Sequence, residues 1–222
     1  MRILWGRANS GNVMKLVWLL EELNIPYERR EAGGNKGRLD TPEFTALNPN
    51  QLIPVLQEGD FILWESNAIL RYLAVTQPGG EAFYPPDPRA RADIDRWLDW
   101  QQTALAASFG RLFYMVARTP PDRQKPRLIE RVAANAGRHW GMLENILTSA
   151  GGITGSTLSL ADFAIGPQLH RWFTLPITRP ALPKLQAWHE RLLARPAYRA
   201  HATVGGAPLA SARARGGDDV ED

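Results

Sequence analysis

The stretch NPNQLIPVLQEGDFILWESNAILRYL, residues 48–73, decides the fold of the first half of this chain. It contains two apolar runs, at residues 54–57 and 61–64, separated by the polar turn Glu58-Gly59-Asp60. Two such runs around a short turn with glycine are typical of a β-hairpin. Ser66 follows the second run, and the apolar residues after it recur at helical spacing. The stretch therefore predicts two paired strands followed directly by a helix.

Strand and helix patterns also alternate upstream of this stretch. A short apolar strand is expected at residues 3–5, a helix with one buried stripe at 12–23, and a second strand at 27–31. This order favours a parallel strand pair joined by a right-handed crossover. Thr41-Pro42 then forms an N-cap and first-turn pair for a short helix. The predicted order of the first half is β-α-β-α-β-β-α.

The composition changes after this first half. Glycine and proline dominate between Pro78 and Pro88, which indicates a linker over residues 79–87. The pattern is helical throughout residues 88–204, whereas the tail, residues 205–222, has little apolar content and is predicted to be disordered. We therefore expect a first domain over residues 1–78 and an all-helical domain over residues 88–204.

The composition also excludes several classes of protein. There is no cysteine, which excludes disulfides, thiolate metal sites and a cysteine nucleophile. A net charge of +3 is too mild and too scattered for a nucleic-acid-binding face. No apolar window is long enough for a membrane span, the N-terminus lacks the apolar run of a signal peptide, and the histidines lack metal-ligand spacing. We expect a cytoplasmic protein with no metal, nucleic acid or membrane partner.

Ser10 and Asn12 lie where the first strand gives way to the first helix. In one interpretation Ser10 only caps this helix, because its hydroxyl would satisfy a free N–H of the first turn. In the other, a hydroxyl and an amide lie beside the positive end of a helix, where an anion is stabilised. Both interpretations are open on this segment alone.

Two dipeptides carry the marks of a site for a peptide-like ligand. Proline cannot donate to a sheet ladder, so Pro54 belongs at the start or the edge of a strand. A cis bond there would turn the backbone N–H and C=O of Ile53 toward an extended ligand. Ser66 is a plausible N-cap, and Glu65 beside it offers a carboxylate to an amine. A helix start next to an acid suits the two charged groups of an amino acid.

The segment from Leu158 to Phe163 has the arrangement of a capping box. Ser159 would cap the following helix, Asp162 would bond back to the cap residue, and Leu158 would pack against Phe163. We interpret this motif as structural, because it fixes where a helix of the second half begins.

Taken together, the chain resembles the cytosolic glutathione S-transferase family over about residues 1–200. The order and spacing of the matches carry the resemblance, together with the helical second half. The matching stretches are Ser10-Gly11-Asn12-Val13 with Lys15, Leu20-Glu21-Glu22-Leu23 followed by Pro26-Tyr27, Pro42-Glu43-Phe44, Asn48-Pro49, Ile53-Pro54, Glu65-Ser66 with Ala68-Ile69 and Tyr72-Leu73, and the capping box. The resemblance implies an α/β plus all-α fold. An N-terminal thioredoxin-like domain (βαβαββα) would precede an all-helical C-terminal domain, usually within a homodimer.

The resemblance also implies roles for single residues. Ser10 aligns with the residue that binds the thiol in theta-like and nu-like classes, and Asn12 with an asparagine of the nu-like group, so both are the expected catalytic residues. Ile53, beside a cis-proline at Pro54, would pair with the cysteinyl part of glutathione through its backbone. Glu65 and Ser66 would hold the γ-glutamyl end. The implied glutathione-binding set is Arg38, Gln51, Leu52, Ile53, Pro54, Glu65 and Ser66.

The chain also departs from the family pattern at three places. It has no tyrosine near the end of the first strand and no cysteine at the beta-class position. Leu52 stands where several classes place a lysine for the glycine carboxylate, a role that Lys36 or Arg38 would then take.

The implied activity is that of a detoxifying glutathione transferase, in which glutathione is the co-substrate and no metal takes part. The glutathione thiolate would attack a small hydrophobic electrophile. Its pocket is expected to be lined by the aromatic residues Trp5, Phe109, Phe113, Tyr114 and Trp172.

Two other functions remain open. A glutathione-dependent disulfide-bond reductase is suggested by the nu-like match at Ser10 and Asn12, and glutathione itself would then perform the thiol exchange. The same fold also serves as a non-catalytic interaction module. Glu65 and Ser66, together with Ser10 and Asn12, favour a working glutathione site over such a module.

Overall fold

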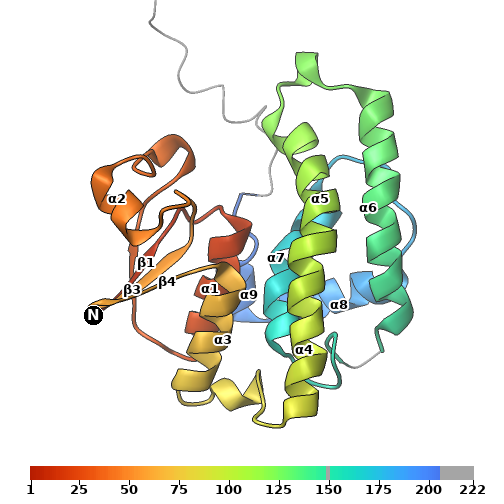
Figure 1. Ribbon diagram of the computed structural model, residues 1–222. Helices are drawn as coiled ribbons and strands as arrows, with labels where there is room; N and C mark the ends of the chain where they lie inside the picture. The colour runs from red at the N-terminus through yellow and green to blue at the C-terminus, as the bar shows by residue number, and fades with distance from the viewer. Residues whose placement is uncertain (149–150, 206–222) are drawn as a thin grey trace, which may run out of the picture.

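A mixed four-stranded sheet forms the centre of the N-terminal half of the computed structural model, which describes residues 1–148 and 151–205 (Figure 1). The strand order within these residues is β2-β1-β3-β4. Strands β1 and β2 are parallel, while β1–β3 and β3–β4 are antiparallel. The bounds are β1 Arg2–Trp5, β2 Glu28–Arg30, β3 Val55–Glu58 and β4 Phe61–Trp64. The predicted parallel strand pair and the predicted hairpin are both confirmed.

Helices cover both faces of this sheet. Helices α1 (Gly11–Glu22) and α3 (Ser66–Thr76) lie on one face, and α2 (Pro42–Leu47) lies on the other (Figure 1). Successive strand residues point to opposite faces. Leu4 and Leu56 therefore join the main hydrophobic core, whereas Trp5 and Val55 join a small second core with Phe44 of α2. The hydroxyl of Thr41 accepts a hydrogen bond from the Phe44 N–H at 3.2 Å, as its predicted role as N-cap requires.

The second half of the chain is helical in its described residues. Helix α4 (Pro88–Trp100) continues without a break through the π-helical turn η3 (Gln101–Leu105), α5 (Ala106–Phe113) and a second π-helical turn, η4 (Tyr114–Arg118). The 3₁₀ turn η5 (Pro121–Arg123) follows, and the remaining helices are α6 Pro126–Ile146, α7 Leu160–Thr174, α8 Pro183–Leu193 and α9 Pro196–His201. Two further 3₁₀ turns lie earlier in the chain: η1 (Gly34–Lys36) between β2 and α2, and η2 (Gly80–Ala82) between α3 and α4. The predicted thioredoxin-like half followed by a helical half is thus confirmed.

Buried hydrogen bonds fix the start of α7. The carboxylate of Asp162 is fully buried and accepts hydrogen bonds from the N–H of Ser159 at 2.8 Å, the hydroxyl of Ser159 at 3.0 Å and the N–H of Ile153 at 3.0 Å. A Cβ on Gly152 would lie only 2.5 Å from the same carboxylate, so the loop approaches too closely for any larger residue. The predicted back-bond from Asp162 to the cap residue is confirmed.

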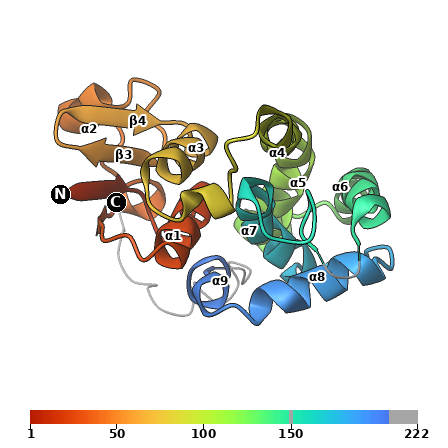
Figure 2. The same ribbon diagram turned by 90° about the horizontal axis from the view of Figure 1, so that it is seen from below.

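Trp18 of α1 joins the two halves of the molecule. Its ring packs against Phe163 of α7 and Tyr198 of α9, with centroid distances of 4.2 and 4.8 Å. Its Nε1 donates to Glu22 at 2.9 Å, and Arg195 donates to the same carboxylate through Nε and Nη2 at 2.8 and 2.6 Å. Figure 2 shows α7 next to α1 and α9 below both. The sheet and the helical half therefore share one continuous core.

The predicted disordered tail lies, apart from Gly205, outside the described residues. The boundaries expected for the linker and the domains remain predictions, although α3 ends at Thr76 and α4 begins at Pro88. Within the described part of the chain, no helix combines the length and the apolar character that a membrane crossing requires.

Candidate functional site

The start of α1 presents unused hydrogen-bond donors. Ser10 occupies the N-cap position, but its hydroxyl makes no capping hydrogen bond, so the interpretation of Ser10 as a side-chain cap is wrong. The carbonyl of Ser10 accepts from the N–H groups of Val13 and Met14 at 3.0 and 2.9 Å. Among the described residues, the preceding N–H groups of the helix, on Gly11 and Asn12, have no such acceptor, as is usual for a first turn. The Asn12 side chain is exposed, and Ser10 retains 8% exposure.

The peptide bond between Ile53 and Pro54 is cis. The β1–β3 ladder begins only at Val55, and among the described residues the backbone N–H and C=O of Ile53 have no hydrogen bond. The loop before it is held by Asn48, which donates to the carbonyl of Leu52 at 2.9 Å and accepts from the N–H of Asn50 at 3.0 Å. Asn48 is a buried positioning residue to which the sequence analysis assigned no role.

Unusual backbone conformations coincide with the predicted glutathione-binding set. Four non-glycine residues of the described chain have positive φ, and three of these, Arg38, Gln51 and Glu65, belong to that set. Their φ angles are 70°, 55° and 72°. Non-glycine residues rarely adopt this conformation, and such strained positions cluster at binding and catalytic sites.

Helix α3 begins one position earlier than the predicted N-cap at Ser66 requires. Glu65, not Ser66, is the N-cap residue, and Ser66 is the first residue of the helix. Ser66 is buried, whereas Glu65 is exposed and accepts a hydrogen bond from Gln102 at 3.1 Å. The prediction of Ser66 as N-cap is therefore wrong, but the combination of an acid and a helix N-terminus is present as expected.

A buried polar network runs beneath this helix start. The ammonium group of Lys15 donates to Asn67 at 2.8 Å and to Gln101 at 3.3 Å. Asn67 in turn donates to Gln102, which contacts Glu65. Burial lowers the pKa of Lys15 to about 7, and the charge of Glu65 only partly offsets this effect. Lys15 thus links α1 to the start of α3.

The lowered pKa of Lys15 has a measurable consequence for stability. Between pH 7 and the ordinary lysine pKa, the unfolded chain holds a proton that the folded chain has released. The Lys15 contribution to the free energy of unfolding should therefore rise with pH, by about 1.4 kcal/mol per pH unit at most, and be constant below pH 7. We expect Lys15→Met to lack this rise. Urea unfolding of both proteins between about pH 7.5 and 9.5 measures the difference, and parallel profiles would contradict it.

The aromatic residues predicted for the electrophile pocket separate into two groups. Trp5, Phe109 and Trp172 are buried in the hydrophobic cores, so we no longer assign them to a pocket. Trp5 packs edge-on against Phe44 on the α2 face of the sheet, and Phe109 packs against Trp172 with centroids 6.2 Å apart. Phe113 is half-buried and Tyr114 is 66% exposed, so both remain accessible to a ligand.

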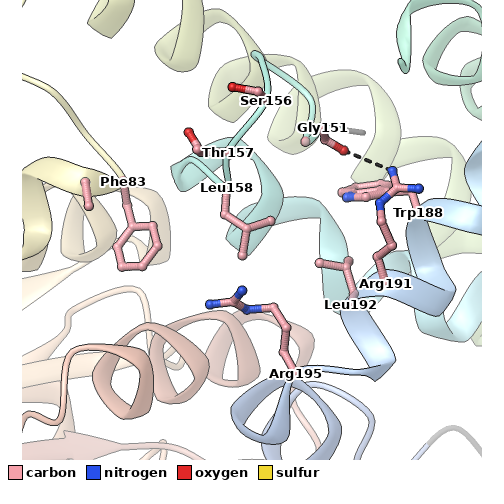
Figure 3. A pocket seen from close by; sticks show the side chains of 11 residues that line it. Phe83, Gly151, Ser156, Thr157, Leu158, Trp188, Arg191, Leu192 and Arg195 are labelled. Atoms are coloured by element: carbon pink, nitrogen blue, oxygen red, sulfur yellow. Dashed lines mark hydrogen bonds between the residues drawn. The ribbon is translucent and has the colours of Figure 1, made fainter. Parts of the chain in front are cut away.

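Two hollows lie outside the predicted glutathione-binding set. Tyr114 lines a groove of about 480 Å³ together with Met115 and Leu128. A cavity of about 630 Å³ lies between the loop after residue 150, η2 and α8, and is bordered by Leu158, Trp188 and other residues (Figure 3). None of the residues predicted for the site lines this cavity, so it is separate from the candidate thiol site.

A buried arginine reaches the start of α1 from the helical half. Arg171 of α7 donates through Nη2 to the carbonyl of Asn9 at 2.7 Å, and a Cβ placed on Gly11 would lie 3.0 Å from its Nη1. No role for Arg171 was predicted from the sequence. The available signal was an arginine on α7, whose residues are otherwise mostly apolar and buried.

The described residues contain no group of three or more His, Cys, Asp and Glu side chains that could hold a metal. Two of the histidines are nevertheless neighbours, since Nδ1 of His170 and Nε2 of His189 are 3.2 Å apart. Burial and the neighbouring His170 together lower the pKa of His189 to about 4, so this ring is neutral near pH 7.

Comparison with known proteins identifies the family of this chain. Residues 2–75 match the family model for the N-terminal domain of glutathione S-transferase, and residues 126–191 match that for the C-terminal domain. The chain is 37% identical to glutathione S-transferase GstB of Escherichia coli K12, covering 90% of this chain and 96% of the relative. It is 30% identical to the disulfide-bond oxidoreductase YfcG of the same organism, covering 86% and 89%. A theta class glutathione S-transferase of Xanthomonas axonopodis pv. citri, solved with glutathione bound, superposes with a TM-score of 0.88 at 40% identity, covering 93% and 99%. The chain belongs to the glutathione S-transferase family.

Proposed function

We propose that this glutathione transferase ionises the thiol of glutathione at the N-terminus of α1. The observation that carries the proposal is the hydroxyl of Ser10, which lies at a helix start and does not cap that helix. Asn12, exposed in the first turn, supplies a second donor. The positive end of the helix dipole adds to both.

The available hydrogen bonds and the helix end match the free energy that ionisation of the thiol requires. A free thiol with a pKa of about 8.5 is only about 3% ionised at pH 7. Lowering that pKa by about two units makes most of it thiolate and requires about 2.7 kcal/mol. A hydrogen bond to a charged group contributes about 1.5–3 kcal/mol, and a helix end about 0.3–1 kcal/mol. Ser10, Asn12 and α1 together are therefore sufficient.

The groups proposed to bind the rest of glutathione come from the loop before β3, the start of α3 and Arg38. The unpaired backbone N–H and C=O of Ile53, before cis Pro54, would pair with the cysteinyl unit as a strand does. The carboxylate of Glu65 and the start of α3 at Ser66 would hold the amine and carboxylate of the γ-glutamyl unit. Gln51 and Leu52 would border the peptide, and the exposed Arg38 would bind the glycine carboxylate.

In the proposed reaction the thiol proton leaves to solvent and the thiolate attacks an electrophilic carbon. The new carbon–sulfur bond forms as the leaving group departs with its electron pair. Phe113 and Tyr114 would contact the apolar part of the electrophile. We place the enzyme in the cytoplasm, where glutathione is kept in its reduced form.

Two measurements test this proposal. The folded protein should bind glutathione-agarose and be released by free glutathione. It should then accelerate conjugation of glutathione to members of a panel of neutral electrophiles. A folded protein that does not bind glutathione would instead support the interaction module.

Disulfide reduction is the second candidate activity. It is favoured by the similarity to an E. coli disulfide-bond oxidoreductase. Because the chain has no cysteine, glutathione itself would perform the thiol exchange. The bound thiolate would attack one sulfur of a disulfide, forming a mixed disulfide and expelling the other sulfur as a thiolate. A second glutathione thiolate would then attack the mixed disulfide, forming oxidised glutathione and releasing the second reduced thiol. Reduction of a small disulfide faster than conjugation of every electrophile would favour this activity.

We also propose that the protein is a homodimer. Strand β4 is one of the two edge strands of the sheet and exposes Phe61, Ile62 and Trp64 by 44%, 37% and 38%. Exposed apolar edges of this kind mark interfaces. Light scattering at micromolar concentration should give twice the mass of the chain. Trp64→Glu should shift the mass toward the monomer, whereas Met142→Glu, at a similarly exposed position on α6, should not. A wild-type monomer would contradict the proposal.

A further inference from the structure

Three arginines gather near the start of α1. Arg7 comes from the loop after β1, Arg118 ends η4, and Arg171 comes from the middle of α7. Each guanidinium group is close enough to another for their charges to repel and to affect a pKa. The charge of Arg118 lowers the pKa of Arg7 and of Arg171, and that of Arg7 also lowers the pKa of Arg171. We call these three residues the arginine cluster.

The arginine cluster has no acidic partner among the described residues. None of its members takes part in an ion pair there, although eight such pairs occur elsewhere in the described chain. Arg171 is only 8% exposed, and its Nε has no hydrogen-bond partner within residues 1–148 and 151–205. Burial, together with the charges of Arg118 and Arg7, lowers the pKa of Arg171 to about 10. Buried charges are normally paired, so an anion would relieve this repulsion.

The arginine cluster also has an apolar surface beside it. The Cζ atoms of Arg171 and Arg118 lie 4.4 and 5.6 Å from the centre of the Phe113 ring. Both guanidinium groups thus contact one half-buried aromatic ring. A ligand here meets positive charge and an apolar face at once, which suits a small molecule that has an anionic group on a short carbon skeleton.

The position of the arginine cluster next to the proposed thiol site limits the length of the ligand's carbon skeleton. Arg171 is bonded to the carbonyl of Asn9, next to Ser10, and its Nη1 faces Gly11. An anionic group bound to Arg171 is therefore close to the proposed position of the sulfur. The reacting carbon must then be separated from the anion by very few bonds.

We propose that Arg7, Arg118 and Arg171 bind the carboxylate of an electrophile whose reacting carbon is next to that carboxylate. The inference rests on the proposed function, because it takes the thiolate to be held at Ser10. It changes the substrate class from hydrophobic electrophiles in general to 2-substituted carboxylic acids, whose short carbon skeleton contacts Phe113. The thiolate attacks carbon 2, the carbon–sulfur bond forms, and the substituent leaves as an anion with its bonding electron pair.

Iodoacetate and iodoacetamide form a matched pair of probes. Both lose iodide to the same thiolate, and they differ chiefly in the charge of the group beside the reacting carbon. For each reagent, kcat/KM is divided by the rate constant of free glutathione thiolate with that reagent. We expect this enhancement to be at least about tenfold larger for iodoacetate, as one charge-assisted contact predicts.

Variants then test the arginine cluster itself. Arg118→Gln should reduce the preference for iodoacetate by about tenfold, because it removes a half-buried cation without breaking an internal ion pair. Arg7→Gln provides the same test if Arg118→Gln does not fold. Arg131→Gln, which removes an exposed arginine of α6, is the matched control and should leave the preference unchanged.

The possible results distinguish a failure of this inference from a failure of the proposed function. Equal enhancement of both reagents by the wild-type enzyme would overturn this inference and leave the proposed function intact. An equal loss with both reagents in Arg118→Gln would also overturn it, since the cluster would then serve the thiolate rather than the electrophile. Turnover of neither reagent, by a protein that binds glutathione, would contradict the proposed conjugation and this inference with it.

Discussion

Ser10→Ala is expected to lower the rate of glutathione conjugation at pH 7 by about 10- to 100-fold, because it removes a hydrogen bond to the thiolate. The pKa of bound glutathione should rise by about one to two units. The loss of rate should shrink as the pH rises, since more of the thiol then ionises without help. The thiolate absorbance of the enzyme–glutathione complex, titrated against pH, measures the shift directly.

The stability of Ser10→Ala distinguishes a role in thiolate binding from a purely structural role of Ser10 as a helix cap. Because the Ser10 hydroxyl makes no capping hydrogen bond, Ser10→Ala should change the free energy of unfolding by less than about 0.5 kcal/mol. A loss near the upper end of the usual N-cap range, about 2 kcal/mol, would support a cap instead. Asn12→Ala should shift the titration in the same direction as Ser10→Ala. Unchanged titrations in both variants would rule out the proposed mechanism.

Glu65→Ala is the control for this experiment. Glu65 meets the far end of glutathione in our proposal, so its loss should raise the KM for glutathione. The pKa of the bound thiol should stay where it is in the wild-type enzyme.

The largest loss of stability is expected from Asp162→Ala. The buried carboxylate of Asp162 accepts hydrogen bonds from two backbone N–H groups and one hydroxyl, and the variant leaves these donors unsatisfied. Each unsatisfied buried donor costs about 1–3 kcal/mol, so we expect a total loss of about 3–5 kcal/mol. Urea unfolding at neutral pH measures it. Asp122→Ala, at an exposed position, should change stability by less than about 0.5 kcal/mol. A loss of similar size in both variants would show that the Asp162 hydrogen bonds contribute little.

Local patterns were sufficient to predict most of the fold. The hairpin at residues 54–64, the cap at Thr41 and the box at Asp162 each depend on residues close together in the chain, and each is found in the structure. The cis bond before Pro54 was expected from the family resemblance rather than from a local pattern.

The pocket prediction failed for aromatic residues whose orientation decides whether they face a ligand or the hydrophobic core. Aromatic character alone does not say which face of a strand or helix a side chain occupies. Trp5 points to the α2 face of the sheet because neighbouring strand residues alternate, and Trp172 lies on the core face of α7. Arg171 was missed because its partner, the carbonyl of Asn9, comes from a segment distant in sequence. No periodicity within α7 reports a contact of this kind.

The junction around Trp18 bears on how this chain is able to evolve. Glu22 of α1 accepts from both Trp18 and Arg195, and the Trp18 ring packs against α7 and α9. A Cβ at Gly166 of α7 would lie 2.8 Å from that same ring. Recombination that exchanges the helical half for that of a relative must therefore bring a matching surface for this tryptophan. Packing at Trp18 therefore constrains the two halves to change together during evolution, even though each half has its own sequence signature.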